Sequence, residues 1–124
     1  MTVPLSSADL RRLAEAARGR RCEACAVLVC PGWESLPAGF DGRQLRVLGT
    51  LRPGEDEPTW QEHHPQGTRT DSPAAPIAPA FHPYNRSDAV ACVHCGRAFL
   101  RYTEAGGYFS DVRLRELDPA LVVD

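Results

Sequence analysis

The sequence contains 124 residues, enough for one domain with a single hydrophobic core, and we predict that residues 1–124 form such a domain. Its 16 acidic and 14 basic residues give a formal net charge of -2, which excludes a global electrostatic attraction to nucleic acids or anionic membranes. All the basic residues are arginine, and the absence of lysine indicates GC-rich codon usage more than selection for phosphate recognition.

The first six residues, Met1 to Ser6, lack the basic start and the apolar stretch of a secretory signal. No later run reaches the roughly 18 apolar residues that a membrane helix requires. We therefore expect a soluble, cytoplasmic protein with no membrane partner. A reducing cytosol also favours thiolate metal ligands over disulfides.

A helix is predicted over about residues 7–18. Ser6 and Asp9 are typical of a helix N-terminus, and Gly19 can end the helix. Its apolar face is formed by Leu10, Leu13, Ala14 and Ala17. We expect this short amphipathic helix to cover the hydrophobic core rather than a membrane or a partner helix.

Two cysteines, Cys22 and Cys25, follow the helix with Cys-x-x-Cys spacing. Such a turn points two thiolates to the same side of a tight loop, as a metal site requires. A local basic cluster surrounds the pair and consists of Arg11, Arg12, Arg18, Arg20 and Arg21. We interpret it as a solvated face that complements the C-terminal end of the helix dipole; the alternative is a patch for nucleic acid or an acidic partner.

Two short strands are predicted next, at residues 26–30 and 44–51, because both runs are rich in apolar and β-branched residues. Cys30 is interpreted as a buried thiol, and its alternatives are a fifth sulfur donor or a reactive nucleophile. Between the strands, Trp33 and Phe40 are expected to anchor a loop in the core.

The segment from about residue 52 to residue 88 holds seven of the chain's 11 prolines. Proline fixes φ and lacks an N–H donor, so neither a helix nor a sheet can run through the segment, and we expect an extended cover loop. Four large side chains should anchor this loop and order it, namely Trp60, Ile77, Phe81 and Tyr84.

Three histidines also lie in this loop, His63, His64 and His82. Clustered imidazoles suggest metal binding or acid–base chemistry, but the i, i+4 histidine pair of a zincin helix is missing, and Pro65 prevents such a helix. We interpret all three as hydrogen-bonded or solvated loop residues. The alternative is a zinc- or thiol-dependent hydrolase that uses these histidines, or Cys30, with Glu34 or Glu62.

The second cysteine pair, Cys92 and Cys95, is followed by Gly96, where backbone amides turn back toward a metal and a side chain would crowd them. A β-hairpin is predicted immediately afterwards, because aromatic and β-branched residues flank the Gly106–Gly107 turn. His94 is expected to be exposed between the two sulfurs, with its ring directed away from a shared metal.

This knuckle and hairpin, about residues 92–112, resembles the zinc-ribbon family, and the overall pattern is similar to that of small bacterial proteins whose role is unassigned. The resemblance covers about a third of the chain and implies four zinc ligands, Cys22, Cys25, Cys92 and Cys95. It implies nothing about catalysis.

The 66 residues between Cys25 and Cys92 exceed the roughly 15–20 of a compact ribbon. Loop-closure entropy grows only logarithmically, so the extra length costs on the order of 1 kcal/mol, against roughly 10–16 kcal/mol from a structural zinc site. We favour Zn²⁺, although rubredoxin-type iron uses similar turns. A redox dithiol and a disulfide framework are weaker alternatives, because Cys92 precedes a strand and the cysteine count is odd.

After the hairpin, residues 113–118 are interpreted as a short helical turn that stops before Pro119, and residues 121–123 as core closure, with dimerisation as the alternative. Together these elements predict an α+β fold: an N-terminal helix, a short antiparallel sheet with the hairpin, and a Pro-rich cover loop. The favoured function is a non-enzymatic zinc-binding module that interacts with a protein or nucleic acid, as a monomer or weak homodimer.

Overall fold

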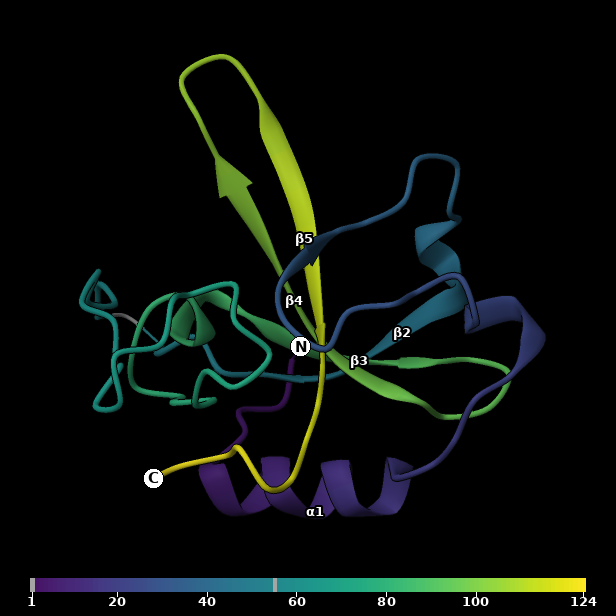
Figure 1. The fold of residues 1–124 in the computed structure, drawn as a ribbon, viewed down its shortest axis with the longest axis horizontal. Helices are drawn as coiled ribbons and strands as arrows, with labels where there is room; N and C mark the ends of the chain where they lie inside the picture. Colours follow the sequence, from purple (N-terminus) through teal and green to yellow (C-terminus); the bar gives the residue numbers. More distant parts are fainter. Residues whose placement is uncertain (1, 55) are drawn as a thin grey trace.

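The computed structural model describes residues 2–54 and 56–124 of the chain and has the predicted α+β class. Its regular elements are the helix α1 (Ser7–Ala17) and the strands β1 (Glu34–Ser35), β2 (Leu45–Thr50), β3 (Asp88–Cys92), β4 (Ala98–Ala105) and β5 (Ser110–Glu116). The strands form one antiparallel sheet in the order β1-β5-β4-β3-β2, and α1 lies along one side of it (Figure 1).

Helix α1 begins with the capping arrangement that its sequence predicts. The Ser6 hydroxyl accepts a hydrogen bond from the Asp9 N–H at 3.1 Å, and the Asp9 carboxylate accepts one from the Ser6 N–H at 2.9 Å. Leu10 and Ala14 are buried, so the apolar face covers the core as expected. The helix ends at Ala17, two residues before Gly19, whose φ of 74° suits glycine.

The sheet separates two hydrophobic clusters, because side chains alternate between its faces along each strand. Ala89 and its β4 partner Leu100 pack in one cluster with α1 and part of the Pro-rich loop. Val90 and its partner Phe99 pack in the other cluster, which includes Cys25, Leu28, Leu45, Cys92 and Leu114. The cysteine pairs thus lie against the sheet face opposite α1.

Strands β4 and β5 form the predicted hairpin and extend it, with paired residues from Phe99 and Glu116 to Ala105 and Ser110. The predicted helical turn over residues 113–118 is wrong, because residues 113–116 continue β5. The alternation of charged and apolar residues there is a strand pattern, and pairing with β4 satisfies its backbone groups. The far end of this hairpin projects from the rest of the molecule (Figure 1).

The predicted strand at residues 26–30 is also wrong: in the described part of the chain this run contains a turn and irregular backbone. Leu28 and Cys30 point into the core, while Val27 and Val29 are exposed. The edge of β5 is paired with β1 at Leu114 and Arg113. The run meets the sheet where the Cys30 carbonyl accepts a hydrogen bond from the N–H of Glu116, at 2.8 Å.

Over its described residues, the Pro-rich loop expected at about 52–88 contains one short 3₁₀ turn, at Tyr84–Arg86, and it leads into β3 at Asp88. Ile77 and Tyr84 are buried as predicted, but Trp60 is 67% exposed, so its expected anchoring role is wrong. The C-terminal residues close over the loop through two backbone hydrogen bonds, in which Ile77 N–H donates to the Leu121 carbonyl and Val123 N–H donates to the Ile77 carbonyl.

Candidate metal centre

The first cysteine pair lies in a 3₁₀ turn, Glu23–Cys25, that follows the end of α1. Within this turn the N–H of Cys22 lies 3.4 Å from the Cys25 Sγ and donates to it. Backbone N–H donors of this kind stabilise a thiolate, so the local fold of the pair suits metal ligation.

The second pair lies at the connection between β3 and β4, with Cys92 as the last residue of β3. The chain reverses there through two hydrogen bonds of 2.8 Å, from Gly96 N–H to the Cys92 carbonyl and from Cys92 N–H to the Arg97 carbonyl. Gly96 has φ 83°, a left-handed conformation that a side chain would strain. The glycine expected after the second sulfur therefore has the turning role that the sequence predicts.

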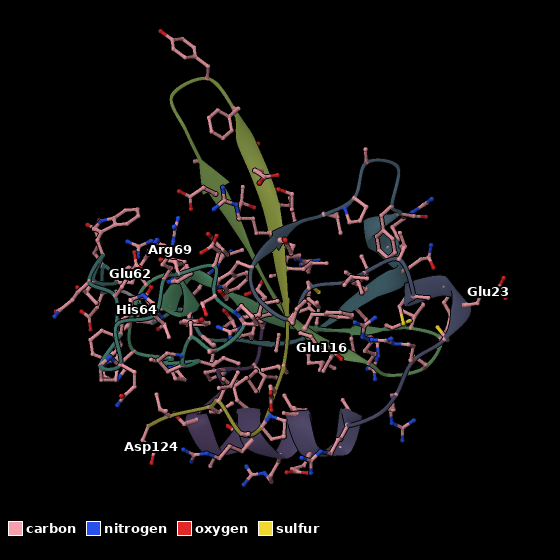
Figure 2. The ribbon with its side chains drawn as sticks, in the orientation of Figure 1. Glu23, Glu62, His64, Arg69, Glu116 and Asp124 are labelled. Carbon is pink, nitrogen blue, oxygen red and sulfur yellow. The ribbon has the colours of Figure 1, made fainter. Side chains whose placement is uncertain are left out.

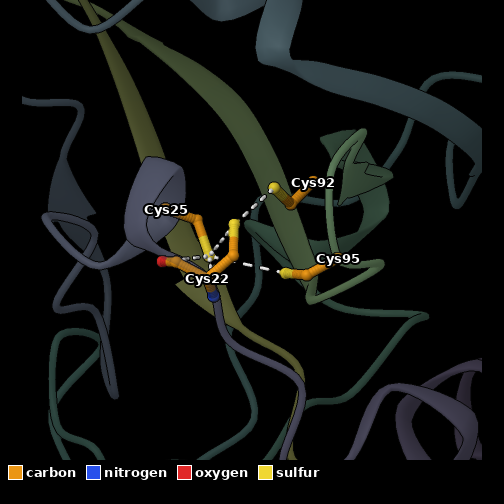
Figure 3. A group of neighbouring side chains, drawn as sticks. All are labelled: Cys22, Cys25, Cys92 and Cys95. Atoms are coloured by element: carbon orange, nitrogen blue, oxygen red, sulfur yellow. Dashed lines mark hydrogen bonds between the residues drawn. The ribbon is translucent and has the colours of Figure 1, made fainter.

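The four sulfurs come together with the spacing of a tetrahedral site (Figure 3). The Sγ of Cys22 lies 3.7 Å from those of Cys25 and Cys92, and the Sγ atoms of Cys25 and Cys95 are 3.6 Å apart. A zinc–sulfur bond of about 2.3 Å implies tetrahedron edges of about 3.8 Å, so the cluster fits one ion. Sulfurs separated this far are not bonded, and all five cysteines are free thiols.

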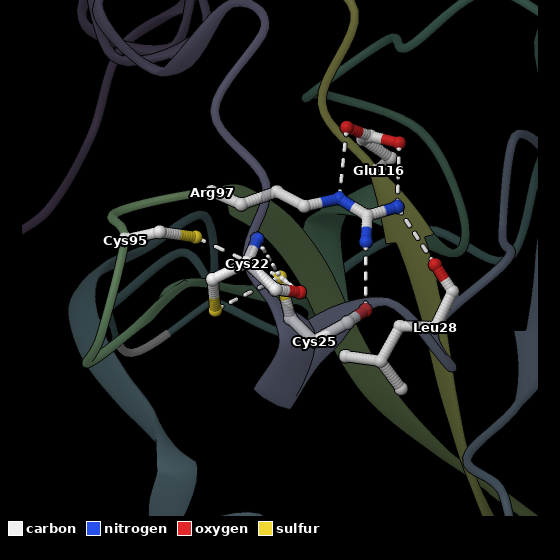
Figure 4. Close-up of polar contacts among 6 residues, drawn as sticks. All are labelled: Cys22, Cys25, Leu28, Cys95, Arg97 and Glu116. Atoms are coloured by element: carbon white, nitrogen blue, oxygen red, sulfur yellow. Dashed lines mark hydrogen bonds and ion pairs between the residues drawn. The ribbon is translucent and has the colours of Figure 1, made fainter.

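The buried guanidinium of Arg97 contacts the backbone of the first cysteine pair (Figure 4). It donates to the carbonyls of Cys25 at 2.9 Å and Leu28 at 2.7 Å. Its remaining donors make a bidentate ion pair with Glu116, at 3.1 and 2.9 Å. Arg97 therefore holds the Cys22–Cys25 turn against β5 and fixes the position of two sulfurs.

The thiols of the cluster differ in pKa, although they lie side by side. Burial raises the pKa of Cys25, but hydrogen bonds from Cys22, Arg97 and Cys95 lower it by more, to about 7. Burial and the neighbouring thiols raise the pKa of Cys95 to about 12. In the metal-free protein these contacts favour the thiolate of Cys25 and disfavour that of Cys95.

Arg20 is the member of the basic cluster that contacts the second pair. Its guanidinium donates to the carbonyl of Cys95 at 3.2 Å and to that of Ala16 at 3.1 Å, and its side chain packs against Gly96. It therefore joins the end of α1 to the knuckle between β3 and β4. Arg18 pairs with Glu15 at 3.4 Å, in the solvated arrangement expected for this cluster.

The other candidate residues are not part of the four-cysteine cluster. His94 is exposed, as expected, and Cys30 is buried, where loss of solvent raises its pKa to about 11. His63 stacks on Phe81, with ring centroids 4.9 Å apart. In the described residues, no histidine or carboxylate joins the four cysteines in a metal-sized cluster.

The remaining two histidines, His82 and His64, have different contacts. His82 stacks near Trp60, with centroids 5.0 Å apart, and its Nδ1 lies 3.3 Å from an Arg86 nitrogen. His64 contacts Glu62 at 2.8 Å, and His82 is also near enough to lower the pKa of the Glu62 carboxyl. The hydrolase alternative pairs a loop histidine or Cys30 with Glu34 or Glu62. One such contact is present, between His64 and Glu62, and it lies outside the four-cysteine cluster.

No protein-family model, curated protein or solved structure matches the chain. Across the described residues, no helix has the length and apolar character needed to cross a membrane. The case for a metal centre therefore depends on the geometry of the four cysteines, which is compatible with one structural ion.

Proposed function

We propose that the chain binds one Zn²⁺ through Cys22, Cys25, Cys92 and Cys95, and that the metal is structural. The observation that carries this proposal is that the four Sγ atoms all lie within 4.8 Å of one another, with three of the separations at 3.6–3.7 Å. Four thiolates complete a tetrahedral shell and leave no position for a substrate or an activated water. The resemblance of residues 92–112 to zinc ribbons supports the same assignment.

The metal has a defined task in this fold, which is to fasten the turn after α1 to the connection between β3 and β4. The segment between the first pair and β2 has little regular structure, since it contains only the two residues of β1 and short 3₁₀ turns. A binding free energy of roughly 10–16 kcal/mol far exceeds the cost of closing the intervening loop. The ion thus stabilises a region whose backbone hydrogen bonds are few.

We further propose that the module binds a protein through the tip of the β4–β5 hairpin. Tyr108 is fully exposed and Phe109 is 63% exposed, and residues 105–110 carry no charge. Exposed aromatic side chains at the end of a projecting element are typical of interaction surfaces. Phe109 also packs on Gly106, which gives the tip a defined shape.

A nucleic-acid partner is less favoured by the charges near this tip. Glu104 and Asp111 lie directly opposite each other on β4 and β5, just before the tip, and two carboxylates there would repel phosphates. Of the basic cluster, Arg20 is engaged by backbone carbonyls and Arg18 by Glu15. We propose a cytoplasmic monomer or weak homodimer that recognises a protein partner.

The metal assignment is tested by elemental analysis of protein purified without added metal. We expect one zinc per chain, release of four thiols after chelation, and a Co²⁺-substituted form with the absorption of a tetrathiolate site. Replacement of Cys22 by serine should abolish stoichiometric binding, whereas Cys30→Ser should retain it. Iron in place of zinc would change the metal identity, and retention of metal by Cys22→Ser would contradict the ligand set.

The choice of partner class is tested with single-stranded and duplex oligonucleotides. We expect weak binding that is unchanged when Arg18, Arg20 and Arg21 are replaced together by glutamine. Tight binding that decreases steeply with salt and disappears in the triple variant would overturn the preference for a protein.

A further inference from the structure

A polar cleft of about 590 Å³ lies between the Pro-rich loop and the edge of the sheet formed by β1 and β5. Its walls include Glu62, His64 and Thr68 from the loop, and Trp33 lies beside them as an aromatic wall. Figure 2 places Glu62, His64 and Arg69 together in one part of the molecule, away from Glu23 in the first cysteine turn. The cleft is therefore separate from the metal centre.

Both ring nitrogens of His64 have partners in this cleft. The Nε2 atom lies 2.8 Å from the Glu62 Oε1, and the Nδ1 atom lies 2.9 Å from the Thr68 Oγ1. The same Glu62 oxygen accepts a hydrogen bond from the Thr70 hydroxyl. His64 and Glu62 are each only partly exposed, so the three groups are held in a fixed row.

The charge of Glu62 determines which His64 nitrogen donates a hydrogen bond and which accepts one. Burial raises the pKa of the Glu62 carboxyl, but hydrogen bonds from Thr70 and His64 lower it by more, so the group is ionised near neutral pH. An ionised carboxylate only accepts hydrogen bonds, so His64 must donate through Nε2–H. In the neutral imidazole Nδ1 is then an acceptor, and it receives the Thr68 hydroxyl proton.

We propose that Glu62, His64 and Thr68 form an acyl-transfer site in which the Thr68 hydroxyl is the nucleophile, His64 the general base and Glu62 the orienting carboxylate. A hydroxyl bonded to an imidazole that a third group orients is the arrangement that activates a weak nucleophile. The site uses neither the metal nor a thiol, and it stands independently of the proposed function. Its substrates are carboxylic esters small enough for a cleft of about 590 Å³.

The reaction proceeds in two balanced steps. The Thr68 Oγ bonds to the ester carbonyl carbon as its proton passes to His64 Nδ1, and the tetrahedral adduct collapses with cleavage of the bond to the alcohol oxygen, which takes that proton. Water then attacks the acyl-Thr68 ester, gives one proton to His64, and releases the acid and the restored hydroxyl. Arg69 also lines the cleft, and its Nε lies 3.7 Å from the Asp71 carboxylate.

The experiment uses the full-length zinc-loaded chain and p-nitrophenyl acetate, with release of p-nitrophenolate followed by absorbance. We expect saturable hydrolysis that His64→Ala and Thr68→Val each reduce by about 100-fold, and that Glu62→Gln reduces by about tenfold. Mass spectrometry of quenched reactions should locate one acetyl group on Thr68. Thr68→Ser, which keeps a hydroxyl, should remain active.

The matched control is His63→Ala, because His63 adjoins His64 in sequence but stacks on Phe81 and does not line the cleft. This variant should hydrolyse the ester at the unchanged rate. An equal loss in both histidine variants, a non-saturable rate, or no hydrolysis above buffer would overturn the proposal. Full activity in Thr68→Val would also overturn it, since the imidazole would then be the nucleophile. Zinc content, measured on every variant, should stay at one per chain and reports separately on the metal centre.

Discussion

The cysteine cluster and the Glu62–His64–Thr68 row differ in how much of the fold is needed to form them. The cluster joins residues that are 70 positions apart, so it exists only when the segment after α1 meets the β3–β4 connection. The row in the cleft is made within a single stretch of the Pro-rich loop, by residues two to eight positions apart. Global stability should therefore depend on the first region, while the second should change with little effect on folding.

Loss of the metal should have the largest effect on the stability of the fold. We expect Cys92→Ser, or chelation of the native chain, to remove most of the roughly 10 kcal/mol or more that a structural zinc site contributes, and to unfold the sheet cooperatively. Circular dichroism and urea titration measure the change. Thr68→Val in the cleft should leave the urea midpoint nearly unchanged. A metal-free chain that unfolds at the same urea concentration as the loaded one would remove the distinction between the two regions.

Replacement of Arg97 by methionine should destabilise the native state by about 3 kcal/mol. The change leaves the Cys25 and Leu28 carbonyls and the Glu116 carboxylate without their donor; Glu116 is 36% exposed, which limits the penalty. Arg97→Lys should be intermediate, because an ammonium cannot reproduce the bidentate pair. Arg101→Met is the control, because Arg101 is a half-buried arginine on β4, which begins directly after Arg97. Equal urea midpoints for Arg97→Met and Arg101→Met would contradict the supporting role of Arg97.

Replacement of Arg115 by methionine should loosen the Pro-rich loop without affecting the metal centre. The buried Arg115 guanidinium donates to the Tyr84 hydroxyl and to the carbonyls of Pro73 and Ala75. Their loss should cost about 2 kcal/mol, offset in part by removal of a buried charge. Limited proteolysis should then cut within residues 52–88 more rapidly, while zinc stoichiometry stays at one. Simultaneous loss of zinc would show that the loop and the metal centre are not independent.

Alkaline pH should reveal the buried fifth thiol. Burial raises the pKa of Cys30 from 9.0 to about 11, so the protonated thiol stabilises the folded state fully below pH 9, and this contribution is lost as pH rises toward 11. Cys30→Ala should flatten the decline in unfolding free energy between these two values. Tyr102, whose pKa burial raises to about 12, contributes to the decline above pH 10 in both proteins. Identical pH profiles would contradict the assignment to Cys30.

The smallest effect on stability is expected at the hairpin tip. Tyr108 is fully exposed, so Tyr108→Ala should change the free energy of unfolding by less than about 0.5 kcal/mol. Phe109→Ala removes the contact with Gly106 and should cost slightly more. Thermal unfolding of the zinc-loaded variants measures both changes. A large loss for Tyr108→Ala would mean that this side chain packs in the fold and is not free for a partner.

Local signals allowed the sequence to predict the helix, the hairpin and the approach of the four cysteines. Ser6 and Asp9 cap the start of the helix, and Gly96 adopts the left-handed conformation of the turn after Cys92. Both effects depend only on residues close in sequence. The strand at residues 26–30 was predicted wrongly: the run is continuously apolar, but Val27 and Val29 are exposed and the run meets the sheet through the Cys30 carbonyl and the N–H of Glu116. Whether a run becomes a strand depends on an available partner, which composition does not reveal.

The supporting residues of both sites could not be predicted for a related reason. Arg97 follows the knuckle and begins an apolar run, and a charged residue there was the available hint, but its partner Glu116 lies 19 positions away. The contact between His64 and Thr68 depends on the path of a loop whose prolines indicate only extended chain. Sequence patterns identified which side chains are reactive, and the fold determined which of them meet.

Arg97 has one further consequence, because Glu116 is paired with Phe99 at the root of the β4–β5 hairpin. The guanidinium that donates to the Cys25 carbonyl therefore also pairs with a residue at the base of the projecting hairpin. The Cys25 carbonyl and the base of the hairpin are thus held by one buried side chain, so a substitution at Arg97 would disturb both regions at once.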